Sequence, residues 1–207
     1  MSEPPVVARY GDPDPGAPLV VLLHGRGSSE TDILGLAGHL PSGPEYVAVR
    51  APIAEGGGYA WFANRGIGRL VAESLAATTA WFRAWLDEVA PAGRPVVLVG
   101  FSGGAAFAGG LLLTDPQRWA GVAVLLGTLP FEDAGMDGGA GRLDGVPVLV
   151  AQGDADTVIP RELLDRTWGW LHDSSGAEVT GHRDPSGHGL TAGTVAALSS
   201  WLTERLG

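Results

Sequence analysis

Short apolar runs alternate with longer amphipathic segments along nearly the whole chain. Most of these runs are continuously apolar, which is typical of parallel strands that are buried on both faces. They predict strands at residues 18–24, 46–50, 95–101, 121–126, 146–152 and 177–182. The segments between the runs predict helices at residues 32–39, 70–89, 103–113, 161–172 and 191–205. The alternation therefore predicts an α/β fold, with a mostly parallel sheet, right-handed crossovers and helices on both faces.

The segment 70–89 shows the helical period most clearly, because its charged side chains lie away from a single stripe. The stripe consists of Val71, Leu75, Thr78, Phe82, Trp85 and Val89. We find no internal repeat and no dividing linker, so residues 1–207 are expected to form a single domain. In an open sheet of this kind, ligands bind beyond the carboxyl ends of the strands. The loops that follow the predicted strands are therefore where chemistry is expected.

Composition and charge exclude several classes of chemistry. The chain has no cysteine, and all 13 of its basic residues are arginine. Thiolate nucleophiles, disulfides, cysteine-ligated metals, lysine Schiff bases and the P-loop lysine are therefore excluded. The net charge of −10 argues against a nucleic-acid partner, whose phosphates need a basic surface.

The sequence carries no signal of a membrane or secreted protein. Its first residues lack the basic start and the apolar stretch of a signal peptide. The longest apolar runs have the length of strands and are too short to span a bilayer. We therefore expect a cytoplasmic protein without an integral membrane segment.

A candidate nucleophile lies at the end of the third predicted strand. Gly100-Phe101-Ser102-Gly103-Gly104 matches the pattern G-x-S-x-G, between the strand at 95–101 and the helix at 103–113. This is the strand–turn–helix setting of a nucleophile elbow. The serine there adopts a strained backbone, and side chains at 100 and 104 would collide with the neighbouring strand and helix. The sequence therefore predicts Ser102 as a nucleophile.

A serine nucleophile needs a carboxylate that orients its base, and in this kind of fold the acid follows a later strand. Asp154 and Asp156 both lie beyond the strand predicted at 146–152. We favour Asp156, because Asp154 lies close enough to the strand to brace the turn.

Three histidines follow the candidate acids. His172 falls at the end of a predicted helix, where bonding to the last carbonyl groups is expected. His182 ends a strand, and His188 lies between two glycines in the loop before the last helix. We expect His188 to be the base, with His182 as the alternative.

An acyl-transfer site also needs two N–H donors for the developing oxyanion. The backbone N–H of Gly103 is one candidate, because it directly follows the nucleophile. The second is expected in the loop after the first predicted strand, from the backbone of Arg26. The Arg26 side chain is expected to be solvated, although a substrate carboxylate could meet it. His24 is interpreted as a structural residue that bonds the backbone of the loop.

Aromatic side chains follow three glycines in the loop after the strand at 46–50. Tyr59, Trp61 and Phe62 are expected to line an acyl or aryl pocket, unless they only cover the edge of the sheet. Leu129 would add an apolar wall. Too few residues separate the strands for a large lid, so we expect an open site for small or medium acyl groups.

Five segments in order resemble the carboxylesterase/phospholipase group of α/β-hydrolases, which includes acyl-protein thioesterases and small bacterial esterases. They are residues 22–27, 100–105, 126–130, 152–160 and 187–188. The resemblance implies an α/β-hydrolase fold without a large cap domain and a triad of Ser102, Asp156 and His188. It also implies action on esters or thioesters without a cofactor or metal, and makes a homodimer possible.

The chain departs from this group at two positions. Members often have Gln after the nucleophile, where this chain has Gly103, and Ser at the position of Leu126. Both changes weaken any transfer of thioesterase or phospholipase specificity. Residues 50–62 are more similar to a bacterial branch of small hydrolases than to eukaryotic thioesterases.

The leading interpretation is a serine hydrolase that cleaves carboxylic esters or thioesters of small to medium acyl groups. A non-catalytic ligand-binding protein on the same scaffold is a second hypothesis, which labelling of Ser102 by a fluorophosphonate would distinguish. Lysophospholipase, acyl-thioesterase and acyl-transfer activity are alternatives that use the same residues in the same site.

Overall fold

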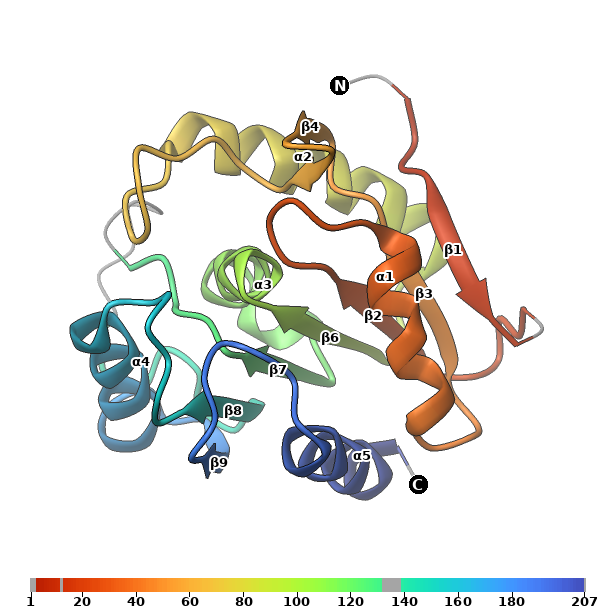
Figure 1. Ribbon diagram of the computed structural model, residues 1–207. Coiled ribbons are helices and arrows are strands. Elements are labelled where there is room, and N and C mark those ends of the chain that lie inside the picture. The colour runs from red at the N-terminus through yellow and green to blue at the C-terminus, as the bar shows by residue number, and fades with distance from the viewer. Residues whose placement is uncertain (1–2, 12, 132–138, 207) are drawn as a thin grey trace.

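The computed structural model describes residues 3–11, 13–131 and 139–206. Its centre is a seven-stranded sheet in the order β1-β3-β2-β6-β7-β8-β9 (Figure 1). All neighbouring strands run parallel except β1, which is antiparallel to β3. The strands are β1 (Val7–Tyr10), β2 (Leu19–Leu23), β3 (Glu45–Val49), β6 (Val96–Phe101), β7 (Gly121–Leu125), β8 (Pro147–Gly153) and β9 (Glu178–Asp184). The prediction of a mostly parallel α/β sheet is confirmed.

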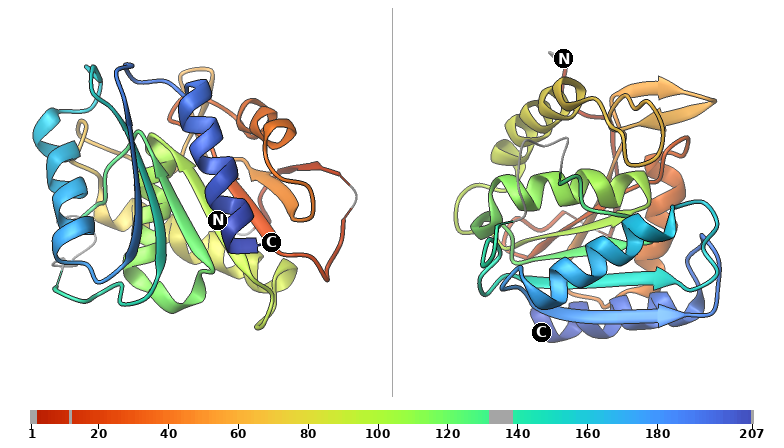
Figure 2. Two further views of the ribbon diagram at one scale, coloured as in Figure 1. Left: turned by 90° about the horizontal axis from the view of Figure 1, so that it is seen from below. Right: turned by 90° about the vertical axis from the view of Figure 1, so that its left-hand side faces the viewer.

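Helices cover both faces of the sheet, as Figure 2 shows. One face carries α1 (Glu30–Leu34), the 3-10 helix η1 (Gly35–His39) and α5 (Ala192–Leu206). The other face carries α2 (Ala72–Val89), α3 (Gly103–Thr114) and α4 (Arg161–Asp173), with the short 3-10 helix η2 (Pro116–Arg118) after α3. Each described α-helix therefore packs on a face of the sheet, and none of them forms a cap over its carboxyl end.

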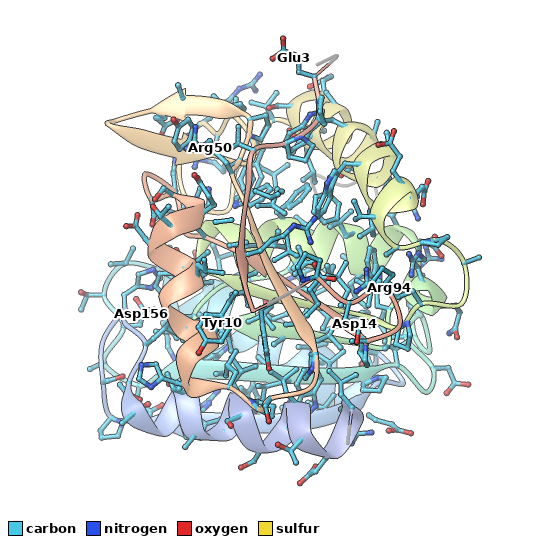
Figure 3. The ribbon with its side chains drawn as sticks, turned by 90° about the vertical axis from the view of Figure 1, so that its right-hand side faces the viewer. Glu3, Tyr10, Asp14, Arg50, Arg94 and Asp156 are labelled. Atoms are coloured by element: carbon cyan, nitrogen blue, oxygen red, sulfur yellow. The ribbon has the colours of Figure 1, made fainter. Side chains whose placement is uncertain are left out.

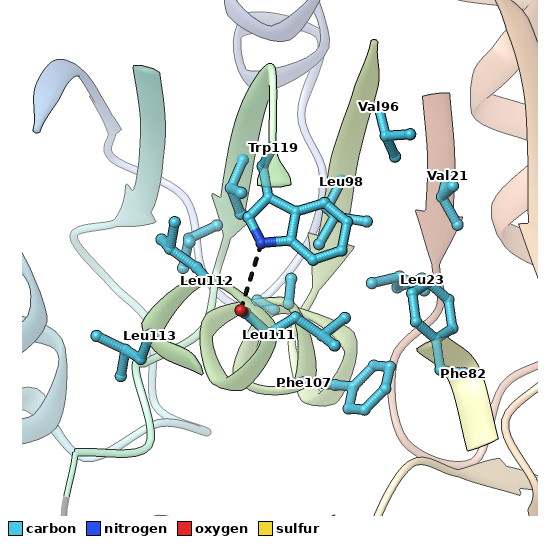
Figure 4. Packing of buried hydrophobic residues seen from close by; sticks show 14 of the residues in the cluster. Val21, Leu23, Phe82, Val96, Leu98, Phe107, Leu111, Leu112, Leu113 and Trp119 are labelled. Carbon is cyan, nitrogen blue, oxygen red and sulfur yellow. Dashed lines mark hydrogen bonds between the residues drawn. The ribbon is translucent and has the colours of Figure 1, made fainter. Parts of the chain in front are cut away.

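Continuous apolar strands serve both layers at once. Along β2, Leu19, Val21 and Leu23 belong to the core under α2 and α3, whereas Val20 and Leu22 belong to the core under α1 and α5. Figure 4 shows the larger core, where the indole N–H of Trp119 donates to the carbonyl of Leu111. This core fixes α3, and with it the turn that precedes α3.

Three strands were not predicted from the sequence. β1 has only four residues, half of them exposed, at the edge of the sheet. β4 (Ile53–Glu55) and β5 (Gly58–Ala60) form a separate two-stranded hairpin. The helix predicted at 32–39 is instead a short α-helix followed by η1. Elements this short leave no clear period in the sequence.

The amino end of the sheet is held by an ion-pair cluster around the buried carboxylate of Glu45. Glu45 accepts hydrogen bonds from Arg9 and from Arg94, the latter at 2.7 Å. Arg94 also donates to the carbonyl of Asp14, and Figure 3 shows these two residues at the opposite end of the molecule from Asp156.

In the described part of the chain, no helix has both the length and the apolar composition to cross a membrane.

Candidate active site

The carboxyl end of β6 turns directly into α3, and Ser102 occupies the turn. Its φ of 54° and ψ of −113° are strained for a residue that carries a side chain. A Cβ on Gly100 would lie 2.4 Å from the carbonyl oxygen of Gly104, and one on Gly104 would lie 2.1 Å from that of Leu23. A residue larger than glycine therefore fits at neither position, because its side chain would collide with the neighbouring strand or helix, as the G-x-S-x-G motif predicts.

The side chains of Ser102, His188 and Asp156 form one chain of hydrogen bonds. Nε2 of His188 lies 2.9 Å from Oγ of Ser102, and Nδ1 of His188 lies 2.8 Å from Oδ2 of Asp156. Because a carboxylate only accepts, Nδ1–H donates to Asp156 and Nε2 accepts from the Ser102 hydroxyl. The structure thus brings together, from three loops, the three side chains that the sequence singled out.

The carboxylate of Asp156 is fully buried and fully bonded. Its Oδ1 accepts from the N–H groups of Val158 at 2.8 Å and Ile159 at 3.0 Å. Burial alone would raise the pKa of Asp156, but the hydrogen bonds from His188, Ile159 and Val158 outweigh it and lower that pKa. The group is therefore ionised at neutral pH and fixes the His188 tautomer whose Nε2 faces Ser102.

The alternative candidates have other partners. The Asp154 carboxylate is exposed and lies 3.9 Å from the Arg161 guanidinium. His182 Nε2 lies 3.5 Å from the carboxylate of Asp184, and His172 Nδ1 bonds the carbonyl of Trp168 in its own helix. Of the candidate acids and bases, only Asp156 and His188 are bonded to one another.

Two backbone N–H groups lie beside Ser102. A Cβ on Gly103 would lie 3.2 Å from the backbone nitrogen of Arg26, so the two residues meet at the turn. Within the described ranges, the N–H groups of Gly103 and Arg26 donate to no other group of the protein. Gly103 also begins α3, whose N-terminus favours negative charge. The arrangement suits an oxyanion.

The first loop of the site is held by buried hydrogen bonds. His24 is fully buried, its Nδ1–H donates to the carbonyl of Gly25 at 2.7 Å, and its Nε2 accepts from the N–H of Ala51 at 3.1 Å. Burial lowers the pKa of His24, although the bond to Gly25 opposes this shift. His24 is therefore a neutral structural residue, in agreement with its interpretation from the sequence.

The Arg26 side chain differs from the expectation of a solvated group. Its guanidinium donates to both carboxylate oxygens of Glu55 and to the carbonyl of Phe62. The side chain is only partly exposed and its charge is already paired, which leaves it poorly suited to a substrate carboxylate.

A cavity of about 380 Å³ opens at Ser102 and His188. Its walls are mostly apolar, and both Trp61 and Phe62 belong to them. Ile67 and Val158, which are among the few exposed large apolar side chains of the described chain, also line this cavity. The site is therefore an open, apolar cleft.

Two of the expected pocket residues lie elsewhere. Tyr59 is not among the residues that line the cavity, and its ring instead lies 4.7 Å under the Arg50 guanidinium. Leu129 lines a smaller adjoining cavity of about 70 Å³, with Phe131 and Leu163. Phe62 and Thr128 line both cavities, so the two adjoin.

Asp184 is a site residue that sequence reasoning missed. It ends β9, and its carboxylate accepts hydrogen bonds from Ser186, Thr191 and Thr194. The bonds from Ser186 and Thr191 lower its pKa far below the ordinary value. Asp184 thereby braces the loop that carries His188. The sequence does show an Asp before a loop that contains Ser and Thr, but this pattern is common in loops and does not by itself indicate a site residue.

Comparisons with known proteins show the family and the fold of this chain. The family model described as Phospholipase/Carboxylesterase matches residues 6–205. MhqD of Bacillus subtilis (strain 168) is 26% identical over 193 residues, which cover 91% of this chain and 94% of MhqD. The crystal structure of the Bacillus cereus carboxylesterase is similar with a TM-score of 0.84 and 27% identity, covering 97% of this chain and 94% of that one.

A plant structure shares the fold at lower identity. The acyl-protein thioesterase 2 of Zea mays is similar with a TM-score of 0.78 and 23% identity, covering 98% of this chain and 99% of that one.

Among the described residues, no group of three His, Asp or Glu side chains is placed to hold a metal ion.

Proposed function

We propose that this chain, which belongs to the phospholipase/carboxylesterase family and is a carboxylic ester hydrolase, uses Ser102 as a nucleophile with His188 and Asp156. The observation that carries the proposal is the unbroken line of hydrogen bonds from Asp156 through His188 to Ser102. Each donor in that line faces an acceptor, as proton transfer from a serine hydroxyl requires.

In the first half-reaction, Oγ of Ser102 forms a bond to the ester carbonyl carbon as its proton passes to Nε2 of His188. The carbonyl oxygen becomes an oxyanion, which accepts from the N–H groups of Arg26 and Gly103. The tetrahedral intermediate then breaks its bond to the leaving group, which takes the proton from His188. The products are an alcohol and an acyl group bonded to Ser102.

In the second half-reaction, His188 takes a proton from water, and the hydroxide formed attacks the acyl carbon. The new tetrahedral intermediate expels Oγ of Ser102, which recovers its proton from His188, and the carboxylic acid leaves. Asp156 stays ionised throughout and stabilises the imidazolium that forms twice in each turnover.

The substrates that fit this site are esters or thioesters with small to medium acyl groups. The cavity of about 380 Å³ has mostly apolar walls, and Arg26, the one arginine among its described lining residues, is already paired with Glu55. An apolar acyl or alcohol group is therefore bound more favourably than an anionic one.

The decisive variant is Ser102→Ala. Its kcat for p-nitrophenyl acetate should fall by about 10⁶-fold, while its Tm stays close to that of the parent protein. In the parent protein, a fluorophosphonate should label Ser102 alone, as mass spectrometry of the digested protein can show. Turnover retained by Ser102→Ala would refute the nucleophile. A correctly folded parent protein that neither turns over esters nor reacts would refute the serine mechanism and favour a ligand-binding role.

The range of substrates is tested by p-nitrophenyl esters of graded acyl length, beside an acyl-thioester. We expect kcat/KM to be greatest for short and medium chains and to fall for long ones. A maximum at long chains would contradict the proposed acyl range and would point to lysophospholipase activity.

A further inference from the structure

The hairpin of β4 and β5, residues 53–60, is the one described pair of strands outside the main sheet. Figure 1 shows it near the loop that leads from β2 to α1. We call residues 24–28 of that loop the oxyanion loop, since it holds the N–H of Arg26. The contacts between hairpin and loop suggest a function for the hairpin.

Main-chain hydrogen bonds join the hairpin to one end of the oxyanion loop. The N–H of Gly27 donates to the carbonyl of Tyr59, and the N–H of Tyr59 donates to that of Ser28, both at 2.9 Å. The approach is close, because a Cβ on Gly58 would lie 2.1 Å from the carbonyl oxygen of Gly27. The other end of the loop is held by Trp61, whose indole N–H donates to the carbonyl of His24 at 2.8 Å.

Arg26 lies between these two anchored ends, with a glycine on each side. Gly27 has a φ of +78°, and a Cβ on Gly25 would lie 3.0 Å from the Phe101 ring, so both positions require glycine. The N–H of Arg26 has no bond of its own within the described chain. The carbonyl of Gly25 in the same peptide unit accepts from Nδ1–H of His24 at 2.7 Å and from the N–H of Ser28 at 3.2 Å, which limits the rotation of that unit. The Arg26 side chain holds the same unit from its other side.

Three hydrogen bonds hold the guanidinium of Arg26, two to the hairpin and one to the segment that follows the hairpin. Its Nε donates to Oε1 of Glu55 at 2.5 Å, its Nη2 donates to Oε2 of Glu55, and its Nη1 donates to the carbonyl of Phe62 at 3.0 Å. A forked, two-point contact with a carboxylate fixes the plane of a guanidinium, which a single contact does not.

We propose that Glu55 is a positioning residue: it holds Arg26 so that the backbone N–H of Arg26 points at the oxyanion. The inference rests on the proposed function, because it assumes that this N–H acts in catalysis. Glu55 is itself too exposed for its ion pair to add much stability. Its effect is therefore expected on the transition state rather than on folding.

The test compares Glu55→Gln with a matched control, Glu178→Gln. Glu178 also forms a partly exposed ion pair with an arginine, Arg205 at 3.1 Å, but lies at the start of β9, away from the site. In Glu55→Gln, kcat for a small ester should fall about tenfold, with KM within about twofold of the parent value. The control should keep both constants. Both variants should keep Tm within about 3 °C.

A second measurement separates positioning from a general structural effect. A trifluoromethyl ketone forms a tetrahedral adduct with a nucleophilic serine and places an oxyanion in the site, whereas the product alcohol carries no negative charge. Glu55→Gln should weaken the binding of the ketone about tenfold and leave that of the product alcohol unchanged. Adding Glu55→Gln to Arg26→Gln should have no further effect on kcat, because the partner is already absent.

Three results would overturn the inference: parent-like kcat in Glu55→Gln, equal weakening of both inhibitors, or an independent loss in the double variant. The Ser102→Ala result keeps these outcomes separate from the proposed function. If Ser102→Ala is inactive and Glu55→Gln behaves like the parent, only the role of Glu55 fails. If Ser102→Ala is active, the proposed function itself fails.

Discussion

Two histidines next to glycine lie in loops at the carboxyl end of the sheet, and their surroundings differ. His24 is fully buried, and both of its ring nitrogens bond backbone groups, at Gly25 and Ala51. His188 is 14% exposed, and its ring nitrogens bond side chains, the Asp156 carboxylate and the Ser102 hydroxyl. One imidazole faces fixed dipoles, and the other joins a carboxylate to a group that can lose a proton.

The partners of an imidazole decide its role more than its position does. A peptide N–H does not give up its proton during the reaction, and a peptide carbonyl does not take one up. A ring bonded to two such groups is therefore a structural link. A ring between a carboxylate and a hydroxyl can accept a proton at Nε2 while its charge is stabilised at Nδ1. The comparison predicts that substitutions in the two loops have different consequences.

The largest effect is expected for His188→Asn. This variant removes the proposed base, so kcat for p-nitrophenyl acetate should fall by about 10⁵-fold or more. The Tm should change little, since the ring is partly exposed and not part of the apolar core. The control is His182→Asn, which removes the alternative base and should stay within about threefold of the parent kcat. The reverse result would assign the base to His182.

His24→Leu should have the opposite profile. Leucine fills similar space but cannot accept from the N–H of Ala51, which would be left buried without a partner. We expect a loss of about 2–3 kcal/mol in the free energy of unfolding, measured by urea denaturation. The kcat should fall by less than about 100-fold. The exposed His172→Leu is the control, with a loss below about 1 kcal/mol. Parent-like stability of His24→Leu would contradict the structural role.

Asp184→Asn tests the brace of the His188 loop. Losing a carboxylate that accepts several bonds should cost about 2 kcal/mol at pH 7 and should reduce kcat about tenfold. The direction of the pKa shift of Asp184 gives the direction in which stability changes with pH. The folded protein holds the pKa of Asp184 below its ordinary value of 3.8, so this stabilisation is present above that value and is lost as the pH falls below it.

Urea denaturation between pH 7 and pH 2 should therefore show a shallower acid decline in Asp184→Asn than in the parent protein. The exposed Asp154→Asn, for which we expect the parent slope, controls for the removal of one acidic group. An unchanged slope in Asp184→Asn would show that its carboxylate gains no stabilisation on folding.

The smallest effect contrasts one glycine from each loop. A Cβ on Gly27 or on Gly189 would meet no atom within 4 Å, but only Gly27 has a positive φ, of +78°. Gly27→Ala should therefore cost about 1 kcal/mol of stability. Gly189→Ala should be neutral, or stabilising by up to about 1 kcal/mol, because alanine restricts the unfolded chain. Equal losses would show that the loop of His188 also needs glycine.

Much of the fold could be predicted because its strands are continuously apolar. Six of the seven strands of the main sheet and the long helices follow from runs and periods that are local in the sequence. The hairpin does not, because residues 53–60 contain three successive glycines and its strands have only three residues each. Its two strands pair with each other and also bond residues 27 and 28, a contact that no local pattern encodes.

The same distinction applies to the candidate site. Ser102, Asp156 and His188 were named because each follows a recognisable strand or a specific motif. Glu55 and Asp184 were not, since their roles come from partners that the fold brings to them. Tyr59 was expected in the pocket as an exposed aromatic, but its ring packs under Arg50. The sequence does not indicate which surface an aromatic side chain will cover.

The hairpin belongs to neither helix layer and shares no strand with the main sheet. On the proposed role of Glu55, substitutions at the exposed positions of this hairpin, Ala54 and Glu55, should change how fast the enzyme turns over without weakening the scaffold that carries the nucleophile. For directed evolution, these positions offer a place to adjust rate independently of robustness, a separation that the tightly packed α3 does not allow.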